Sequence, residues 1–199
     1  MEKCDFNLAA DIAADCNSMS VKGLDNSGVI INFDDIDREA SAFDSTNKSI
    51  LTSLILNSGA KGYRCYVPGK TPFTGTNKTL AVGTYVNTWT KQVHLVVLNE
   101  GPDVTTDIID KLANGRFVVV LGNKTTGKGG KATYEVYGYE AGLTAAEISN
   151  DKYSEETNGG YAVSLEETGG NKSGIFLFSE SLKATKTMLD SLVAGSTGS

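Results

Sequence analysis

The sequence predicts a mainly β (α+β) fold: an antiparallel β-sandwich or barrel with two or three helices, one midway along the chain and one C-terminal. Three observations lead to this prediction. Short runs rich in Val, Ile, Tyr, Phe and Thr recur from residue 20 onward, with apolar and polar residues alternating. Gly, Asn, Asp and Ser separate these runs, as expected where strands turn. Only a few segments repeat their apolar residues at helical spacing.

Length and composition predict a single folded domain. The 199 residues are enough for one sizeable core, and contents of 40% hydrophobic and 21% charged residues are ordinary for a globular protein. No repeat, linker or break in composition divides the chain. We therefore expect one β-rich domain over residues 1–195, followed by a small, polar and flexible tail at residues 196–199.

Ten segments carry the strand pattern. In QVHLVVL, for example, Val93, Leu95 and Val97 share one face of the predicted strand. Turn residues in DNSG (25–28) and ETGGNKSG (167–174) predict hairpin loops. The predicted strands cover residues 21–24, 28–33, 49–56, 62–67, 79–86, 92–98, 116–121, 132–139, 161–166 and 174–178.

Helices are predicted in three places. The longest begins near Pro102 and ends at Gly115, residue types that favour a helix start and stop respectively. Its apolar side is formed by Val104, Ile108, Ile109 and Leu112. TAAE (144–147) has the spacing of a capping box and predicts a short helical turn. ESLKATKTMLDSLV (180–193) predicts the C-terminal helix.

Two long loops are predicted between these elements. PGKTPFTGTN (68–77) holds two of the three prolines among turn residues, and its ten residues exceed the usual length of a connection. We expect it to project from the body of the protein. NDKYSEETNGG (150–160) is a second such loop, polar and acidic.

One stretch resembles a phosphate-binding loop. GNKTTGKGGK (122–131) follows the apolar run FVVVL and matches G-x-x-x-x-G-K-[S/T] except that Gly129 occupies the hydroxyl position. A true phosphate loop also needs the N-terminus of a following helix, whereas the next residues, ATYEVYGY, carry a strand pattern. We interpret the stretch as a glycine-rich turn between two strands.

No catalytic or metal-binding set emerges from the sequence. His94 is the only histidine, lies within a predicted strand and lacks an identifiable partner. Cys4, Cys16 and Cys65 form no C-x-x-C pair, so neither a zinc site nor a disulfide framework is expected. The acidic segment DDIDRE (34–39) lacks the spacing of a calcium loop and is interpreted as a solvated turn. We expect no enzyme activity, no cofactor and no bound metal.

Charge and hydropathy argue against several partners. A net charge of −6 and a pI near 4.8 disfavour specific recognition of nucleic acid. No apolar run is long enough to span a membrane, and the acidic N-terminal residues are unlike a secretory signal. We expect synthesis in the cytoplasm and no membrane partner.

Aromatic residues gather in the last third of the chain. Because strand alternation buries about half of such residues, we expect core and interface packing, with a sugar-binding platform as the alternative. The residues concerned are Tyr134, Tyr137, Tyr139, Tyr153, Tyr161, Phe176 and Phe178.

The order of elements resembles that of phage virion structural proteins of the tail-tube type: strands, a protruding loop, a helix midway, then more strands. Residues 74–121 carry most of the resemblance, and the Tyr-rich segment ATYEVYGYEAGL (132–143) adds to it. The resemblance implies a virion subunit, made in a bacterial host cytoplasm, that self-assembles into stacked rings, usually hexameric, and contacts other virion proteins.

The resemblance also implies that the loop at 68–77 reaches a neighbouring subunit, with Pro68, Lys70, Pro72 and Phe73 as candidate interface residues. Independently, a sandwich has sheet edges that copies of the chain can pair. The negative net charge suggests that the lumen of such a tube is acidic. The alternatives are a head-decoration or neck protein, and a β-sandwich module that binds carbohydrate or a cell surface.

Overall fold

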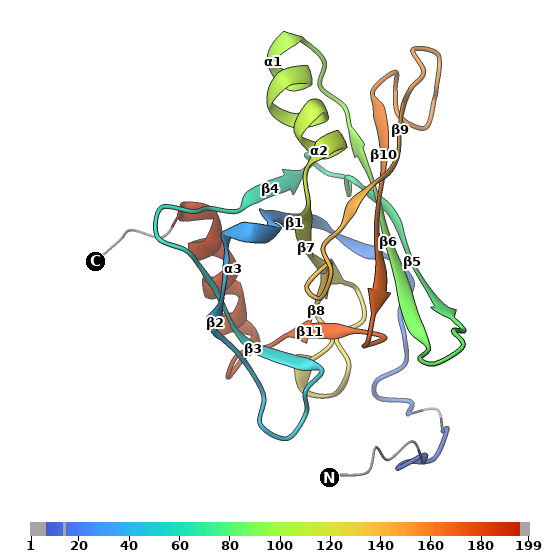
Figure 1. Cartoon of the computed structure of the whole chain (residues 1–199), viewed down its shortest axis with the longest axis vertical. Coiled ribbons are helices and arrows are strands. Elements are labelled where there is room, and N and C mark those ends of the chain that lie inside the picture. The colour runs from blue at the N-terminus through green and yellow to red at the C-terminus, as the bar shows by residue number, and fades with distance from the viewer. Residues whose placement is uncertain (1–6, 14, 196–199) are drawn as a thin grey trace.

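Two β-sheets and one helix lie in three layers in the computed structural model, which describes residues 7–13 and 15–195 (Figure 1). A seven-stranded sheet has the order β2-β3-β11-β8-β7-β1-β4, and a four-stranded sheet has the order β5-β6-β10-β9. The strands are β1 (Leu24–Asn32), β2 (Ile36–Phe43), β3 (Ile50–Leu56), β4 (Tyr63–Tyr66), β5 (Phe73–Ala81), β6 (Thr88–Val97), β7 (Phe117–Asn123), β8 (Tyr134–Tyr137), β9 (Thr144–Asn150), β10 (Tyr161–Gly170) and β11 (Ile175–Leu177).

The predicted fold class is confirmed. The mainly β chain has one helical segment midway, made of α1 (Pro102–Val104), a π-helical turn (Thr105–Ile109) and α2 (Asp110–Asn114), and one C-terminal helix, α3 (Leu182–Ala194). The named strands pair in antiparallel fashion except for β3 and β11, which are parallel. This exception arises because the chain returns from the four-stranded sheet to the middle of the seven-stranded one. No described helix has the length and apolarity that crossing a membrane requires.

The seven-stranded sheet is covered on both faces, and this explains why β7 reads as the unbroken apolar run FVVVL. Val118 and Val120 face α3, whereas Val119 and Leu121 face the four-stranded sheet. The cluster beneath α3 comprises Val29, Ile31, Ile36, Leu51, Leu54, Leu56, Val118, Val120, Val136, Tyr139, Ile175, Leu177, Leu189 and Leu192. The cluster between the sheets comprises Ile30, Phe73, Val93, Leu95, Leu112, Phe117, Val119, Leu121, Tyr137, Leu143, Val163 and Leu165.

The mid-chain helix begins and ends where the sequence predicts. Pro102 occupies the first turn, and the backbone N–H of Gly115 closes the helix on the carbonyl of Lys111. The π-helical turn widens the segment by one residue, which rotates the predicted apolar side. Ile109 and Leu112 are therefore buried, whereas Ile108 is 40% exposed.

The predicted helical turn at residues 144–147 is wrong, because this segment belongs to strand β9. Pairing with β10 decides the conformation: Ala145 lies opposite Leu165, and Ile148 lies opposite Val163. A capping-box spacing is a local signal, and the pairing and packing of the seven-residue strand β9 outweigh it.

The DNSG signal at residues 25–28 is not a hairpin, because β1 continues through it. The register with β7 shifts between Leu24 and Gly28, so the turn residues form an irregularity within one long strand. Gly28 is required here, since a Cβ atom would lie 2.7 Å from the Phe73 ring and 2.8 Å from the Val120 carbonyl oxygen. The second signal, 167–174, is not a hairpin: its first four residues end strand β10, and the rest connect to β11 in the other sheet.

Two further boundaries differ from the prediction. The expected loop at residues 68–77 ends early, since β5 begins at Phe73, and the expected strand at 79–86 gives way after Ala81 to a hairpin tip at residues 82–87. The acidic segment 34–39 is a turn only at Asp34 and Asp35, after which β2 begins. Pairing of Ile36 with Leu56 explains the strand, because it places Ile36 in the core.

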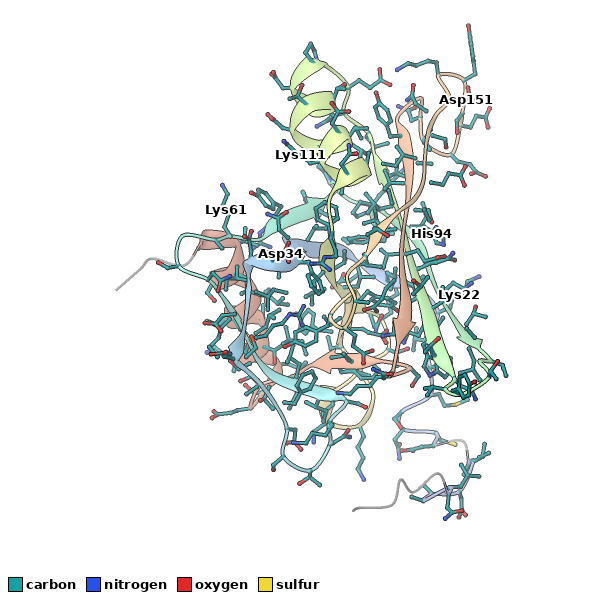
Figure 2. The ribbon with its side chains drawn as sticks, in the orientation of Figure 1. Lys22, Asp34, Lys61, His94, Lys111 and Asp151 are labelled. Atoms are coloured by element: carbon teal, nitrogen blue, oxygen red, sulfur yellow. The ribbon has the colours of Figure 1, made fainter. Side chains whose placement is uncertain are left out.

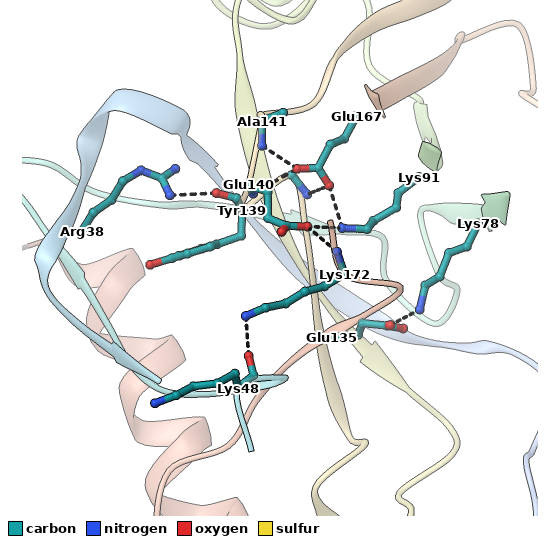
Figure 3. Close-up of polar contacts among 11 residues, drawn as sticks. Arg38, Lys48, Lys78, Lys91, Glu135, Tyr139, Glu140, Ala141, Glu167 and Lys172 are labelled. Carbon is teal, nitrogen blue, oxygen red and sulfur yellow. Dashed lines mark hydrogen bonds and ion pairs between the residues drawn. The ribbon is translucent and has the colours of Figure 1, made fainter. Parts of the chain in front are cut away.

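A buried ionic cluster joins the two sheets where β8 leads into β9 (Figure 3). Glu167 on β10 has no solvent exposure, and its carboxylate accepts hydrogen bonds from the backbone N–H groups of Gly138 (3.3 Å), Glu140 (3.0 Å) and Ala141 (2.7 Å). The ammonium of Lys91 on β6, 1% exposed, lies 3.1 Å from both Glu167 Oε2 and Glu140 Oε2. The chain turn between the sheets is thus held by one buried carboxylate.

We predict that Glu167→Gln lowers the free energy of unfolding by about 3–5 kcal/mol, because it leaves the buried Lys91 ammonium without its full counter-charge. Urea denaturation followed by circular dichroism measures the change. Glu166→Gln is the matched control: Glu166 is the neighbouring residue but lies on the outward face, and its replacement is expected to change stability by about 0.5 kcal/mol or less. Equal losses in the two variants would contradict this role for Glu167.

Candidate functional site

The residues able to carry chemistry lie apart from one another. Among the described residues, no three His, Cys, Asp or Glu side chains approach closely enough to hold a metal ion. Figure 2 labels His94, which lies on the outer face of the four-stranded sheet beside a shallow hollow of about 200 Å³. On this face, Ser164 of β10 lies between Glu147 of β9 and His94 of β6. A nucleophile–base–acid relay requires the histidine in the middle, and here the serine occupies that place.

Cys65 lies on the wall of a larger groove and is poorly suited to nucleophilic chemistry. Burial raises the pKa of its thiol to about 12, so the reactive thiolate is scarce at neutral pH. Cys16 is exposed on the segment before β1, and Cys4 lies outside the described residues. The GNKTTGKGGK stretch is a connection, as predicted: β7 ends at Asn123, and a short turn at Lys128–Gly130 leads toward β8.

The four predicted interface residues divide into two pairs. Pro68 and Lys70 are exposed in the turn between β4 and β5, which is closed by a hydrogen bond from the Lys70 N–H to the Val67 carbonyl. Pro72 and Phe73 are buried, and Phe73 packs in the core between the sheets. Only Pro68 and Lys70 are therefore available for contact with another molecule in this conformation.

Three strongly exposed apolar side chains lie instead close together on the β5–β6 hairpin tip, residues 82–87. Val82 is 82% exposed, Tyr85 is 97% exposed and Val86 is 65% exposed. The tip belongs to a run of uncharged residues, TLAVGTYVNTWT (79–90). Edge strands usually carry charges that prevent association, and this end of β5 carries none. The absence of charge in residues 79–90 is a sequence signal that could have pointed to this tip. The prediction instead placed the projecting segment at residues 68–77.

A groove of about 1330 Å³ lies between β4, the end of β6 and the mid-chain helical segment. Its apolar walls include Tyr63, Tyr66, Leu98 and Ile108, each 40% exposed or more. Charged residues stand among them: Lys61, Arg64, Asp107, Asp110 and Lys111. Lys61 and Lys111, labelled in Figure 2, come from separate segments that line it.

β4 is an end strand of the seven-stranded sheet, so its free edge lies beside this groove. The sequence could not predict the groove, because its lining residues come from segments as far apart as Ile30 and Val193.

The outer face of the four-stranded sheet carries carboxylates and no lysine or arginine. Its four strands contain two lysines, and both point toward the other sheet: Lys78 pairs with Glu135, and Lys91 pairs with Glu167 (Figure 3). Glu147 and Glu166 remain on the outer face, where Glu166 accepts a hydrogen bond of 2.5 Å from the Gln92 amide. Small and polar residues fill most of the rest of this face, whose charged side chains are thus negative.

The aromatic residues of the last third mostly pack inward, as expected. Tyr137 and Tyr139 are buried, and Tyr153 alone among the seven is fully exposed, on the loop before β10. They therefore form no exposed row of the kind on which a sugar ring stacks.

Comparison of this chain with protein-family models, with curated proteins and with solved structures finds no match. The argument for function therefore rests on the surfaces described above.

We predict that iodoacetamide at pH 8 alkylates Cys65 at least about ten-fold more slowly than Cys16. The reason is that burial raises the Cys65 pKa to about 12, so at pH 8 the thiolate form of Cys65 is a very small fraction. Peptide mass spectrometry over a time course measures both rates in the same sample. Repeating the experiment in urea provides the control, since unfolding removes the burial and should bring the two rates together.

Proposed function

We propose that this protein is a structural subunit of a phage-like particle. Specifically, we propose a tail-tube protein that self-assembles into stacked rings through intersubunit β pairing. The observation that carries the proposal is the four-stranded sheet: β5 and β9 are its end strands, and its outer face has carboxylates but no strand lysine or arginine. Such a sheet can continue from copy to copy around a channel, with this face toward the lumen. The tail-tube resemblance in element order supports the same role.

The free edges supply the assembly contacts. β5 ends the four-stranded sheet on one side and β9 ends it on the other, so head-to-tail pairing of β5 with the β9 of a neighbour extends one sheet around a ring. Unpaired backbone N–H and C=O groups at such edges favour association of copies, and the uncharged end of β5 does not oppose it. Copies of itself are thus the principal proposed partners, together with other virion proteins at the ends of the tube.

The charge of the outer face suits a conduit for DNA. Phosphates bind surfaces rich in Lys and Arg, and the inward-pointing Lys78 and Lys91 leave none in the strands of this face. Glu147 and Glu166 repel phosphates instead, so a duplex passing along the lumen is not retained. The ion pairs Lys78–Glu135 and Lys91–Glu167 hold both strand lysines on the inner side of the sheet and so keep this face free of positive charge.

We predict that negative-stain electron microscopy of the purified protein at high concentration reveals rings or tubes of uniform diameter. The physical reason is mass action, since edge pairing between copies grows with concentration. Mass-resolved chromatography over a dilution series should give a shift from assemblies to subunits. A clean monomer at every concentration would count against the proposed function.

We predict that tubes of the double variant Glu147→Lys, Glu166→Lys retain DNA that the wild type does not. The measurement is the amount of a short labelled duplex, added during assembly, that survives nuclease digestion. The four-charge change on the proposed lumen makes phosphate binding favourable and dependent on salt. Glu155→Lys, Glu156→Lys is the matched control, with the same change in charge on the exposed loop before β10. Equal nuclease protection in both variants would place the outer face of the sheet outside the lumen.

A further inference from the structure

We infer that the β5–β6 hairpin tip of one copy, residues 82–87, inserts into the groove of a second copy, forming a head-to-tail contact. The inference rests on the proposed self-assembly and names a pair of surfaces that edge pairing alone does not use. It follows from three properties of the chain: the chemistry of the tip, the chemistry of the groove and their positions in the fold.

The tip has the character of an inserting element. Val82, Tyr85 and Val86 project from a two-stranded hairpin whose strands are held together over eight paired positions. The nearest charged side chains along the chain, Lys78 and Lys91, are fixed in ion pairs with Glu135 and Glu167, and they do not accompany the tip. A rigid aromatic anchor flanked by aliphatic side chains is the group that contributes most to protein interfaces.

The groove has the complementary character. Tyr66, Leu98 and Ile108 give it exposed apolar surface, and charged side chains such as Arg64 and Lys111 also line it. An apolar centre with a charged rim is the usual anatomy of a protein–protein interface. The free edge of β4 adds backbone groups with which an entering strand can pair.

The two features lie at opposite ends of strand β6, which makes the contact head-to-tail. β6 begins at Thr88, directly after the tip, and its last residues, Leu95 to Val97, line the groove. Ten strand residues separate the two features by about 30 Å. Figure 1 shows the helical segment at the top and the β5–β6 turn at the lower right, at the other end of β5 and β6. One copy therefore cannot fill its own groove, and a chain of copies can fill every groove except the last.

Other occupants fit the groove less well. Its volume of about 1330 Å³ exceeds the roughly 300–1,000 Å³ of small-molecule sites, which favours a peptide segment. The C-terminal end of α3 lies beside the groove through Val193, but residues 196–199 are Ser-Thr-Gly-Ser and offer no apolar side chain. The tip supplies uncharged apolar side chains, and no charge has to be desolvated when they leave water.

The test compares three single variants by sedimentation velocity and electron microscopy. Tyr85→Asp places a charge on the tip, Ile108→Lys places one in the groove, and Tyr153→Asp is the control, because Tyr153 is 94% exposed on a loop that belongs to neither surface. We expect the first two variants to weaken the head-to-tail contact at least about ten-fold, and the third to assemble as the wild type does. Unchanged thermal unfolding verifies that each variant folds.

Mixing the two defective variants gives the decisive result. A Tyr85→Asp copy retains its groove, and an Ile108→Lys copy retains its tip. In the mixture, the intact tip of the second variant can enter the intact groove of the first. We therefore expect pairs of subunits, or pairs of rings, and no longer assemblies. Pairs in the mixture support the inference, and their absence overturns it. A C-terminal truncation at residue 195 that alone changes assembly would also overturn it, by assigning the groove to the chain's own end.

The outcomes separate this inference from the proposed function. A wild type that stays monomeric at every concentration overturns both. Wild-type rings or tubes that Tyr85→Asp and Ile108→Lys leave intact overturn the hairpin-to-groove contact alone. Single rings in these variants support the contact and assign it between rings, whereas complete dissociation supports it within a ring.

Discussion

The buried carboxylate of Glu167 is the constraint on which the arrangement of the two sheets depends. Three backbone N–H groups of the turn at residues 138–141 donate to it, and Lys91 supplies the opposing charge. A buried carboxylate is stable only when its oxygens are satisfied in this way. The turn that carries the chain from the seven-stranded to the four-stranded sheet is thereby fixed, and Gly138 is required in it, since φ is +82° and a Cβ atom would lie 2.5 Å from the Phe117 carbonyl oxygen.

This constraint also shapes the outer surface. By holding Lys91 inside, the cluster leaves the outer face of the four-stranded sheet without positive charge, and the Lys78–Glu135 pair acts in the same direction. The inward-pointing lysines and the negative exterior of this sheet are thus two consequences of one pattern of side-chain alternation. A sheet with these properties is suited to line a passage for a polyanion, as proposed.

The candidate site was predictable in part. The sequence predicted a projecting segment at residues 68–77, between the fourth and fifth predicted strands, and sheet edges available for pairing. It misplaced the projecting segment, because two prolines in residues 68–77 outweighed the absence of charge in residues 79–90. The structure places Phe73 in the core and Tyr85 in solvent. Turn-forming residues identify where a chain bends, whereas projection depends on what packs against the bend.

The sequence by itself determined the fold class, the central strand β7 and both main helices, because alternation, unbroken apolar runs and helical spacing are local properties. Only the tertiary structure decided that residues 144–150 form β9, that β3 and β11 are parallel, and that Lys91 meets Glu167 across 76 residues of sequence. The groove likewise joins β4 to residues of the mid-chain helical segment. These features depend on contacts between distant segments, and the free energy of such contacts exceeds the weak local preferences that a sequence pattern reveals.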